Sequence, residues 1–216
     1  MTEIKIENLV KTIKGNKVID NITLTLTSPK IVGFKGINGS GKTMLMRLIC
    51  GLIKPTDGKI TINGKVLHKD ISFPESIGVL IENPAFLDGY SGFENLKMLA
   101  SIKNIVKDYQ IKDIIRAVGL NPDDKKHYKK YSLGMKQRLG IACALMESPD
   151  IIVLDEPTNA LDSDGITMVK ELIVQKREEG ALVIISCHDI DILKELSEEI
   201  YVLEQGKLTD HFNVEE

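Results

Sequence analysis

Eight consecutive residues constrain this chain more than any other stretch, because their spacing matches a phosphate-binding loop. Three glycines allow tight turns with no Cβ in the way, so successive N–H groups can converge on phosphate oxygens at a helix N-terminus. Lys42 adds a positive charge for the β- and γ-phosphates, and Thr43 offers a hydroxyl to Mg²⁺. The pattern predicts that a magnesium nucleoside triphosphate contacts Gly36, Ile37, Asn38, Gly39, Ser40, Gly41, Lys42 and Thr43.

The elements on either side of the loop support this prediction. The pattern alone arises by chance in about one chain in a hundred of this length. Here, however, an apolar run at 31–34 precedes the loop. Apolar residues follow it at helical spacing, from Met44 to Leu52, until Gly51 and Pro55 close the helix. Strand, loop and helix in this order are what a phosphate loop requires.

Composition and charge narrow the class of protein. A chain of 216 residues with a net charge of -3 and a pI near 5.9 favours one globular domain and gives no electrostatic footprint for nucleic acid. Cys50, Cys143 and Cys187 lack Cys-x-x-Cys spacing, so we expect reduced thiols and neither a disulfide nor a zinc site. No apolar run approaches the ~20 residues of a membrane span. We therefore expect a cytoplasmic protein that acts on a membrane only through another chain.

Hydrophobic patterning predicts the fold class. Segments in which apolar and polar residues alternate indicate antiparallel strands with one solvent-facing side. We expect a turn at Gly15-Asn16 between the first two of these strands. Continuous apolar runs indicate buried parallel strands. The alternating segments are 4–9, 22–26 and 58–64, and the continuous runs are 31–34, 77–81, 151–154 and 181–185. Helical periodicity covers 92–146, and helices at 164–179 and 190–196 and a hairpin at Gln205-Gly206 complete the chain.

These elements predict an α/β fold: a P-loop NTPase core with a parallel sheet, an antiparallel β subdomain and an inserted helical subdomain. We expect a single domain over 1–216, with the core and β subdomain at about 1–83 and 148–216. The helical subdomain would occupy about 84–147. Within it, the lysine-rich run 125–130 has the character of a solvated loop, and we assign it no ligand.

Two carboxylates follow the apolar run at 151–154, which places them at the carboxyl end of a core strand, where ligands bind in open α/β sheets. The interpretation that fits the phosphate loop assigns Asp155 to Mg²⁺ and makes Glu156 the general base that orients the attacking water. The alternative is a helix N-cap beside Pro157.

A third motif makes the pattern recognisable. Together with the phosphate loop and Asp155-Glu156, the segment 131–139 resembles the signature of ATP-binding cassette (ABC) proteins, in which two cassettes sandwich two ATP molecules. Asn159 to Asp162 is similar to the D-loop of that family, and His188 to its switch histidine. The resemblance thus spans the whole chain, with five motifs in the family's order.

The resemblance implies roles for further residues. Ser132 and the Gly134 backbone would contact the γ-phosphate held by the partner cassette, and Asp162 would shape the dimer interface. His188 would bridge the γ-phosphate and the lytic water, so it joins Glu156 as a catalytic candidate. The implied partners are a second cassette and a membrane-spanning permease, and nucleic acid is not among them.

Three departures from the family pattern are informative. Ile13 stands where an aromatic residue usually stacks on adenine, and Leu133 and Met135 replace two residues of the signature. Glu82 replaces the glutamine at the end of the 77–81 strand, which adds a carboxylate near the metal and makes Glu82 a further catalytic and metal-binding candidate. The alternative is a drifted cassette in which Glu82 is merely tolerated there.

Glu82 with the signature segment resembles the ATPases of bacitracin-resistance and lantibiotic-immunity exporters. We therefore expect an ATP- and Mg²⁺-dependent ATPase subunit of a bacterial exporter for peptide antibiotics or similar amphipathic compounds, on the inner face of the cell membrane. The segment from Glu82 through Leu87 would report the state of the site to the permease. The alternatives are an ABC subunit for another cargo, a soluble ABC ATPase for DNA repair or translation, and a nucleotide-binding regulator without turnover.

Overall fold

The computed structural model describes residues 1–214 and contains a six-stranded sheet with the strand order β10-β9-β3-β8-β7-β6. Neighbouring strands in it are parallel, except that β10 runs antiparallel to β9. The bounds are β3 (Lys30–Lys35), β6 (Ile77–Leu80), β7 (Ile151–Asp155), β8 (Leu182–Cys187), β9 (Glu199–Glu204) and β10 (Lys207–Asn213). The predicted α/β class is confirmed.

The central strands contain unbroken apolar runs because both faces of the sheet are covered. In β7, Ile151 and Val153 belong to the core on one side, and Ile152 and Leu154 to the core on the other. Since successive side chains of a strand point to opposite faces, burial on both sides demands an unbroken apolar run. The polar residues that follow such a strand therefore lie at the edge of the sheet, where a ligand can reach them.

A second, four-stranded antiparallel sheet has the order β2-β1-β4-β5. Its strands are β1 (Glu3–Ile13), β2 (Asn16–Thr27), β4 (Asp57–Ile62) and β5 (Lys65–Val66). The turn between β1 and β2 is Lys14-Gly15, one residue earlier than the predicted Gly15-Asn16. Both turn residues have positive φ, 49° and 84°, as a two-residue hairpin turn requires, and Asn16 already pairs with Ile13.

Helix α1 (Lys42–Ile49) follows the phosphate loop and packs in the core shared by the two sheets. It ends before Leu52, which sequence periodicity had assigned to the helix but which is 53% exposed. Gly51 has φ 75°, and the N–H of Leu52 donates to Arg47 O. A left-handed glycine with this hydrogen bond turns the chain away from the helix axis, so Leu52 leaves the buried face.

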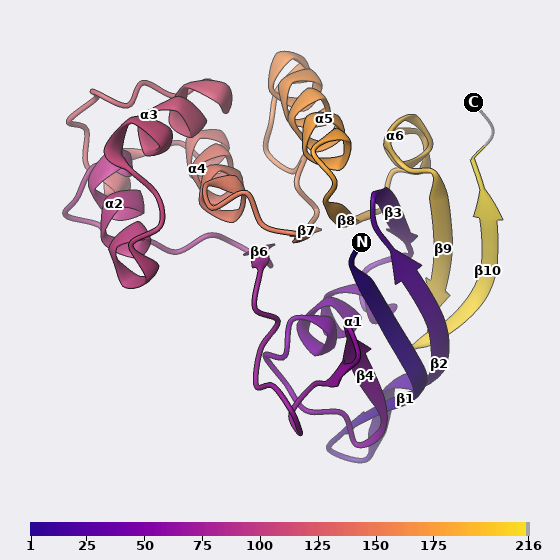
Figure 1. Ribbon diagram of the computed structural model, residues 1–216. Coiled ribbons are helices and arrows are strands. Elements are labelled where there is room, and N and C mark those ends of the chain that lie inside the picture. Colours follow the sequence, from indigo (N-terminus) through magenta and orange to yellow (C-terminus); the bar gives the residue numbers. More distant parts are fainter. Residues whose placement is uncertain (215–216) are drawn as a thin grey trace.

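The helical segment forms a group at one side of the molecule (Figure 1). It contains α2 (Gly92–Lys103), α3 (Asp108–Ala117), a short 3₁₀ helix (Tyr128–Lys130) and α4 (Leu133–Leu145). Helix α4 also packs against β6, where Gly78 lets the strand approach the Ala144 carbonyl. The group is thus anchored to the main sheet through α4. Helices α5 (Ser163–Glu178) and α6 (Ile190–Leu196) cover the same sheet further along.

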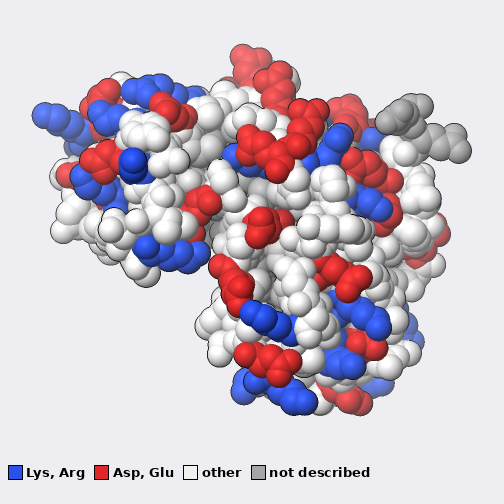
Figure 2. All heavy atoms as spheres, in the orientation of Figure 1, with Lys and Arg blue, Asp and Glu red and all other residues white. Residues whose placement is uncertain are grey.

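The surface is hollowed between the helical group and the lobe that holds α1 and the antiparallel sheet (Figure 2). Acidic and basic side chains are interspersed over both lobes on this face. Among residues 1–214, no helix combines the length and the apolar character needed to cross a bilayer.

Candidate active site

The phosphate loop joins the end of β3 to the start of α1, as predicted. Gly39 and Gly41 have φ of 82° and 111°, a region that L side chains rarely adopt. A Cβ at Gly36 would lie 2.4 Å from Ser40 Oγ, so the first loop position also requires glycine. No side chain caps α1, and its first turn has no acidic residue, so the N-terminal N–H groups of this helix suit an added anion.

Lys42 occupies the centre of the loop with its ammonium group buried. Nζ donates to Gly36 O at 2.6 Å and to Ile37 O at 3.4 Å, and it lies 3.7 Å from Glu156 Oε1. A buried charge is stable only when it is paired or hydrogen-bonded, and these three oxygens supply that environment. The lysine is therefore held in the loop before any phosphate arrives.

Thr43 and Asp155 lie together at the next position along the sheet edge. Thr43 Oγ1 donates to Asp155 Oδ2 at 2.6 Å, and Ser186 Oγ donates to Asp155 Oδ1 from the neighbouring strand β8. Asp155 is buried, at 6% exposure. A carboxylate and a hydroxyl in contact are hard oxygen donors of the kind that Mg²⁺ prefers, so this pair fits the predicted ion.

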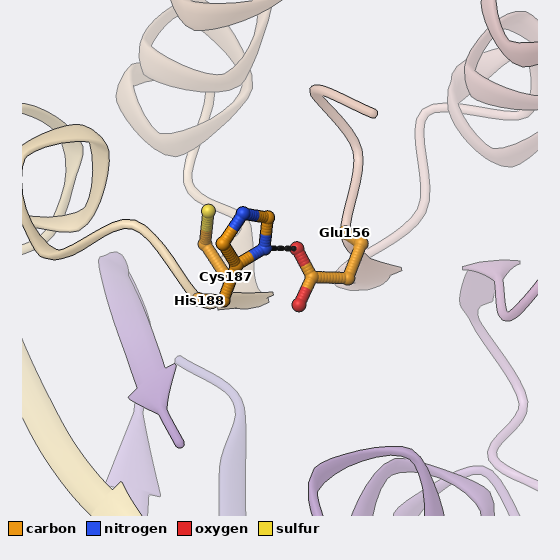
Figure 3. A group of neighbouring side chains, drawn as sticks. All are labelled: Glu156, Cys187 and His188. Carbon is orange, nitrogen blue, oxygen red and sulfur yellow. Dashed lines mark hydrogen bonds and ion pairs between the residues drawn. The ribbon is translucent and has the colours of Figure 1, made fainter. Parts of the chain in front are cut away.

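Glu156 follows directly and leaves the direction of the strand. Its φ is 50°, in the left-handed region that is uncommon for non-glycine residues, and its N–H donates to Ser186. This turn directs the carboxylate toward the end of β8, where His188 Nδ1 donates to Glu156 Oε2 at 3.0 Å (Figure 3). The predicted base and the predicted switch histidine thus meet, although 31 residues separate them in the sequence.

Glu82 lines the same cavity of about 320 Å³ as Thr43, Asp155 and Glu156. Its side chain is 60% exposed and forms an ion pair with Arg47 of α1, with 2.8 Å between Oε1 and Nη2. Sequence reasoning missed Arg47, because a basic residue in the last turn of a helix is ordinary and nothing in the spacing connects it to Glu82. The carboxylate therefore lies at the rim of the cavity with a cation beside it.

The signature residues line a different cavity, of about 550 Å³, formed by Ser132, Gly134 and Asp162 with their neighbours. Ser132 caps α4, and Asp162 caps α5. Asp162 also accepts a hydrogen bond from Arg138 at 2.8 Å. The structure therefore brings the signature together with the D-loop, but not with the phosphate loop of the same chain.

Ile13 is paired with Asn16 at the end of β1 and is 38% exposed. On the β2 side, the cavity beside the phosphate loop is lined by Val18, and Ile13 is not among its lining residues. The predicted position of the adenine ring next to Ile13 therefore stays a prediction.

Gln137 is a second residue that sequence reasoning did not single out. It is buried on α4, and its Nε2 donates to Glu156 O at 3.1 Å and to Pro157 O at 3.2 Å. The signature helix thus holds the backbone of the loop that carries the predicted base. Gln137 could have been noticed because it lies within the signature segment, but the sequence alone does not show which carbonyl groups it binds.

The lysine-rich run 125–130 is only partly the solvated loop that its charge predicts. Its four lysines are exposed, but Tyr128 is buried, donates from its hydroxyl to Pro84 O at 2.6 Å and packs edge-on against Phe86. Charge patterning reports the average of a segment, and a single aromatic residue can still enter the core. Tyr128 connects this loop to the segment that follows Glu82.

The three cysteines are free thiols. Burial raises the pKa of Cys50 to about 12, and burial with the nearby Glu147 charge raises that of Cys143 to about 11. Burial also raises the pKa of Cys187, and the Glu156 carboxylate adds to this effect. All three are therefore protonated at neutral pH when no metal is bound, as expected for reduced thiols.

Comparison with known proteins identifies the family. Residues 19–159 match the profile of the ABC transporter family. The chain belongs to this family. It is 48% identical, over 95% of its length and 94% of the relative, to the uncharacterized ABC transporter ATP-binding protein YybJ of Bacillus subtilis.

Two further comparisons bear on subgroup and fold. The bacitracin transport ATP-binding protein BcrA of Bacillus licheniformis is 38% identical over 97% of this chain and 69% of its own. The dimeric structure of MJ0796, a bacterial ABC transporter cassette, superposes with a TM-score of 0.89 at 24% identity, over 99% of both chains. The predicted family, the fold and the role as the ATP-binding and ATP-hydrolysing subunit of an ABC transporter are confirmed. The roles of single residues stay predictions.

Proposed function

We propose that this ABC subunit hydrolyses ATP with Glu156 as the general base. The observation that carries the proposal is the meeting of Lys42, Glu156 and His188 beside the Thr43–Asp155 pair, at the carboxyl edge of the parallel sheet. A base, a phosphate-binding cation and an oxygen-donor pair are the parts that phosphoryl transfer to water requires.

Each of these residues has a distinct task. The loop N–H groups and Lys42 bind and orient the triphosphate, which is the main contribution of a protein to phosphoryl transfer. Glu156 accepts the proton of the attacking water. His188 holds that carboxylate through Nδ1 in the nucleotide-free state and turns to the γ-phosphate when ATP is present.

Mg²⁺ would be held by Thr43 and Asp155, with Glu82 at the rim of the cavity. When bound, the ion neutralises charge on the triphosphate. The ion pair of Glu82 with Arg47 reduces the repulsion between this carboxylate and the phosphates, so both residues adjust how strongly nucleotide binding depends on the ion.

The site is completed by a second copy of the chain. Ser132, Gly134 and Asp162 line a cavity separate from the phosphate loop, so within one chain they have no phosphate to contact. Two copies arranged head to tail would bring each signature to the phosphate loop of the other. The cassette MJ0796, which superposes on this chain with a TM-score of 0.89, is dimeric, and this supports a dimer here.

The cassette works on the inner face of the cell membrane, bound to a permease, and drives export of peptide antibiotics. The likeness to a bacitracin transport protein supports this cargo class. The exposed segment around Leu87 lies between Glu82 and α2, so it can carry a change at the ATP site to a membrane partner.

The catalytic proposal is tested by Glu156→Gln, which keeps the shape of the side chain and removes the base. We expect at least a ~10²-fold slower hydrolysis with ATP binding retained, since loss of a general base typically has this effect. Phosphate release measures the rate, and equilibrium binding of a fluorescent ATP analogue measures the affinity. Hydrolysis at the wild-type rate would show that Glu156 is not the base.

The cargo proposal needs a separate experiment. Expression of the chain with its permease in a bacitracin-sensitive host should raise the inhibitory concentration of bacitracin, and the same pair carrying Lys42→Ala should not. Equal tolerance in both strains would remove peptide export from the proposal while leaving the ATPase intact.

A further inference from the structure

Glu156, Cys187 and His188 form a compact group of three different metal-ligand types. One carboxylate oxygen, the Cys187 sulfur and one nitrogen of the His188 ring lie within 4.8 Å of one another. The residues follow or end two adjacent parallel strands, β7 and β8, so the sheet register itself brings them together (Figure 3). Cys187 has no part in the hydrolysis proposed above.

The ligand chemistry differs from that of the magnesium pair. Thiolate and imidazole are softer ligands than carboxylate and hydroxyl, and they select zinc and similar thiophilic divalent ions. Three protein ligands with one open position are a common tetrahedral arrangement for Zn²⁺. The Thr43–Asp155 pair offers only oxygen atoms, which suit Mg²⁺. The two sets of residues at this sheet edge therefore favour two different classes of ion.

The geometry is close to what a tetrahedral ion needs. Zinc bonds of about 2.0–2.3 Å place ligand atoms roughly 3.3–3.8 Å apart. The present group, whose ligand atoms lie within 4.8 Å of one another, therefore has to contract by up to about 1–1.5 Å. The His188 side chain is 64% exposed and can move, whereas Cys187 is buried. Glu156 and His188 line adjoining cavities that share the phosphate loop, so an ion in the nucleotide cleft can reach these two ligands first. Cys187 lines neither cavity, so its sulfur joins them only when the exposed His188 ring shifts.

We propose that the nucleotide-free cassette binds Zn²⁺, or another thiophilic divalent ion, through Glu156, Cys187 and His188, and that this ion blocks ATP hydrolysis. The Cys187 thiol gives its proton to solvent, the imidazole binds in its neutral form, and no electron is transferred. The proposal that the ion binds depends only on the geometry of these three residues. The block also rests on the roles proposed for Glu156 and His188, because the ion would hold the base and the histidine away from ATP.

The binding half is tested with Co²⁺ on the nucleotide-free full chain, since cobalt in place of zinc reports a sulfur ligand by thiolate-to-metal charge-transfer absorption. We expect this band in the wild type, its loss in Cys187→Ser, and displacement of Co²⁺ by Zn²⁺. Cys143→Ser is the matched control, because Cys143 is also a free thiol but lies on α4 outside the cluster. Zn²⁺ affinity should fall at least about tenfold in Cys187→Ser alone, since loss of even an outer-shell partner has an effect of that size.

An unchanged band in Cys187→Ser, or no band in the wild type, would overturn the proposal. Should Cys187→Ser fail to fold, the wild type still tests it: magnesium with a non-hydrolysable ATP analogue should weaken Co²⁺ binding, and unaffected binding would place the ion elsewhere. Hydrolysis measured at buffered free Zn²⁺, with magnesium and ATP below saturation, should fall in the wild type and in Cys143→Ser, but not in Cys187→Ser. If zinc binds through Cys187 but does not inhibit hydrolysis, the proposed inhibition is wrong. The proposal that Glu156 is the general base is not affected by that result, because Glu156→Gln tests it separately.

Discussion

The phosphate-loop edge and the signature surface carry the same kinds of side chain, but they are organised in opposite ways. At the phosphate-loop edge, Lys42 and Asp155 are buried and already bonded to their neighbours. On the signature surface, Leu133 is 73% exposed, Ser132 caps its own helix, and Asp162 caps α5 and pairs with Arg138 while its side chain stays 72% exposed. One region is built before its ligand arrives, and the other presents groups that still lack their main partner.

The difference has a physical reason. Burying an ionised lysine and an ionised aspartate destabilises a fold unless both are compensated, so the first region has to be internally complete. A surface that must associate and separate during each cycle cannot be buried in the monomer. The contrast therefore indicates which half of the site belongs to one chain and which half has to be supplied by a second.

The largest effect that separates the two regions is expected for Ser132→Ala, compared with Ser91→Ala. Both serines cap helices, so each change should lower the free energy of unfolding by about 1 kcal/mol. Only Ser132→Ala removes a proposed contact with the partner's ATP, and we expect its hydrolysis rate to fall about tenfold, the equivalent of 1.4 kcal/mol. Thermal unfolding and phosphate release measure the two quantities.

An equal loss of activity in both serine variants would mean that Ser132 acts only through helix stability. The signature surface would then have no role of its own in hydrolysis.

A smaller effect is expected at the adenine end of the phosphate-loop region. Stacking of a base on an aromatic ring contributes about 1–3 kcal/mol, and Ile13 cannot provide it. Because Ile13 is not among the residues that line the cavity, we expect a gain at the low end of this range for Ile13→Tyr: about 1 kcal/mol of ATP binding, near fivefold in affinity, with a greater preference for ATP over GTP. Ile105→Tyr, an exposed position in the helical segment, is the control. No gain over that control in a nucleotide titration would contradict the stacking argument.

The smallest effect is expected for Glu82→Gln. An exposed charge interaction contributes up to about 1 kcal/mol, and the pair with Arg47 offsets part of it, so ATP affinity in EDTA should rise by only about threefold. Hydrolysis with magnesium should stay within about tenfold. Glu75→Gln, which breaks a comparable exposed pair with Lys65, controls for general charge effects.

Equal ATP affinity in EDTA for the wild type and Glu82→Gln would show that this carboxylate does not sense the phosphates. Glu82 would then be a tolerated neighbour of the site.

The sequence could predict whatever depends on local pattern. The phosphate loop lies between a strand and a helix, and the acidic pair Asp155-Glu156 lies at the end of an apolar strand, where spacing and periodicity indicated. The parallel direction of the central strands could also be predicted, because parallel strands are buried on both faces and such burial requires an unbroken apolar run in the sequence.

Sequence could not predict what depends on side chains brought together by the fold. Arg47 meets Glu82, Gln137 meets the carbonyl of Glu156, and Tyr128 meets Pro84, across separations with no periodic signature. The exposed Leu52 and the early turn at Lys14-Gly15 were missed because one or two left-handed residues end an element without changing the hydrophobic pattern around it.

Light scattering of Glu156→Gln during size-exclusion chromatography tests most directly whether a second chain completes the site. We predict a mass of 24.0 kDa without nucleotide or with ADP, and twice that mass with magnesium and ATP. Adding Ser132→Asp keeps a good helix cap but sets a carboxylate against the partner's phosphate, so the ATP-bound protein should return to the monomer mass. A monomer in ATP, or an ATP-dependent dimer that survives Ser132→Asp, would contradict the account.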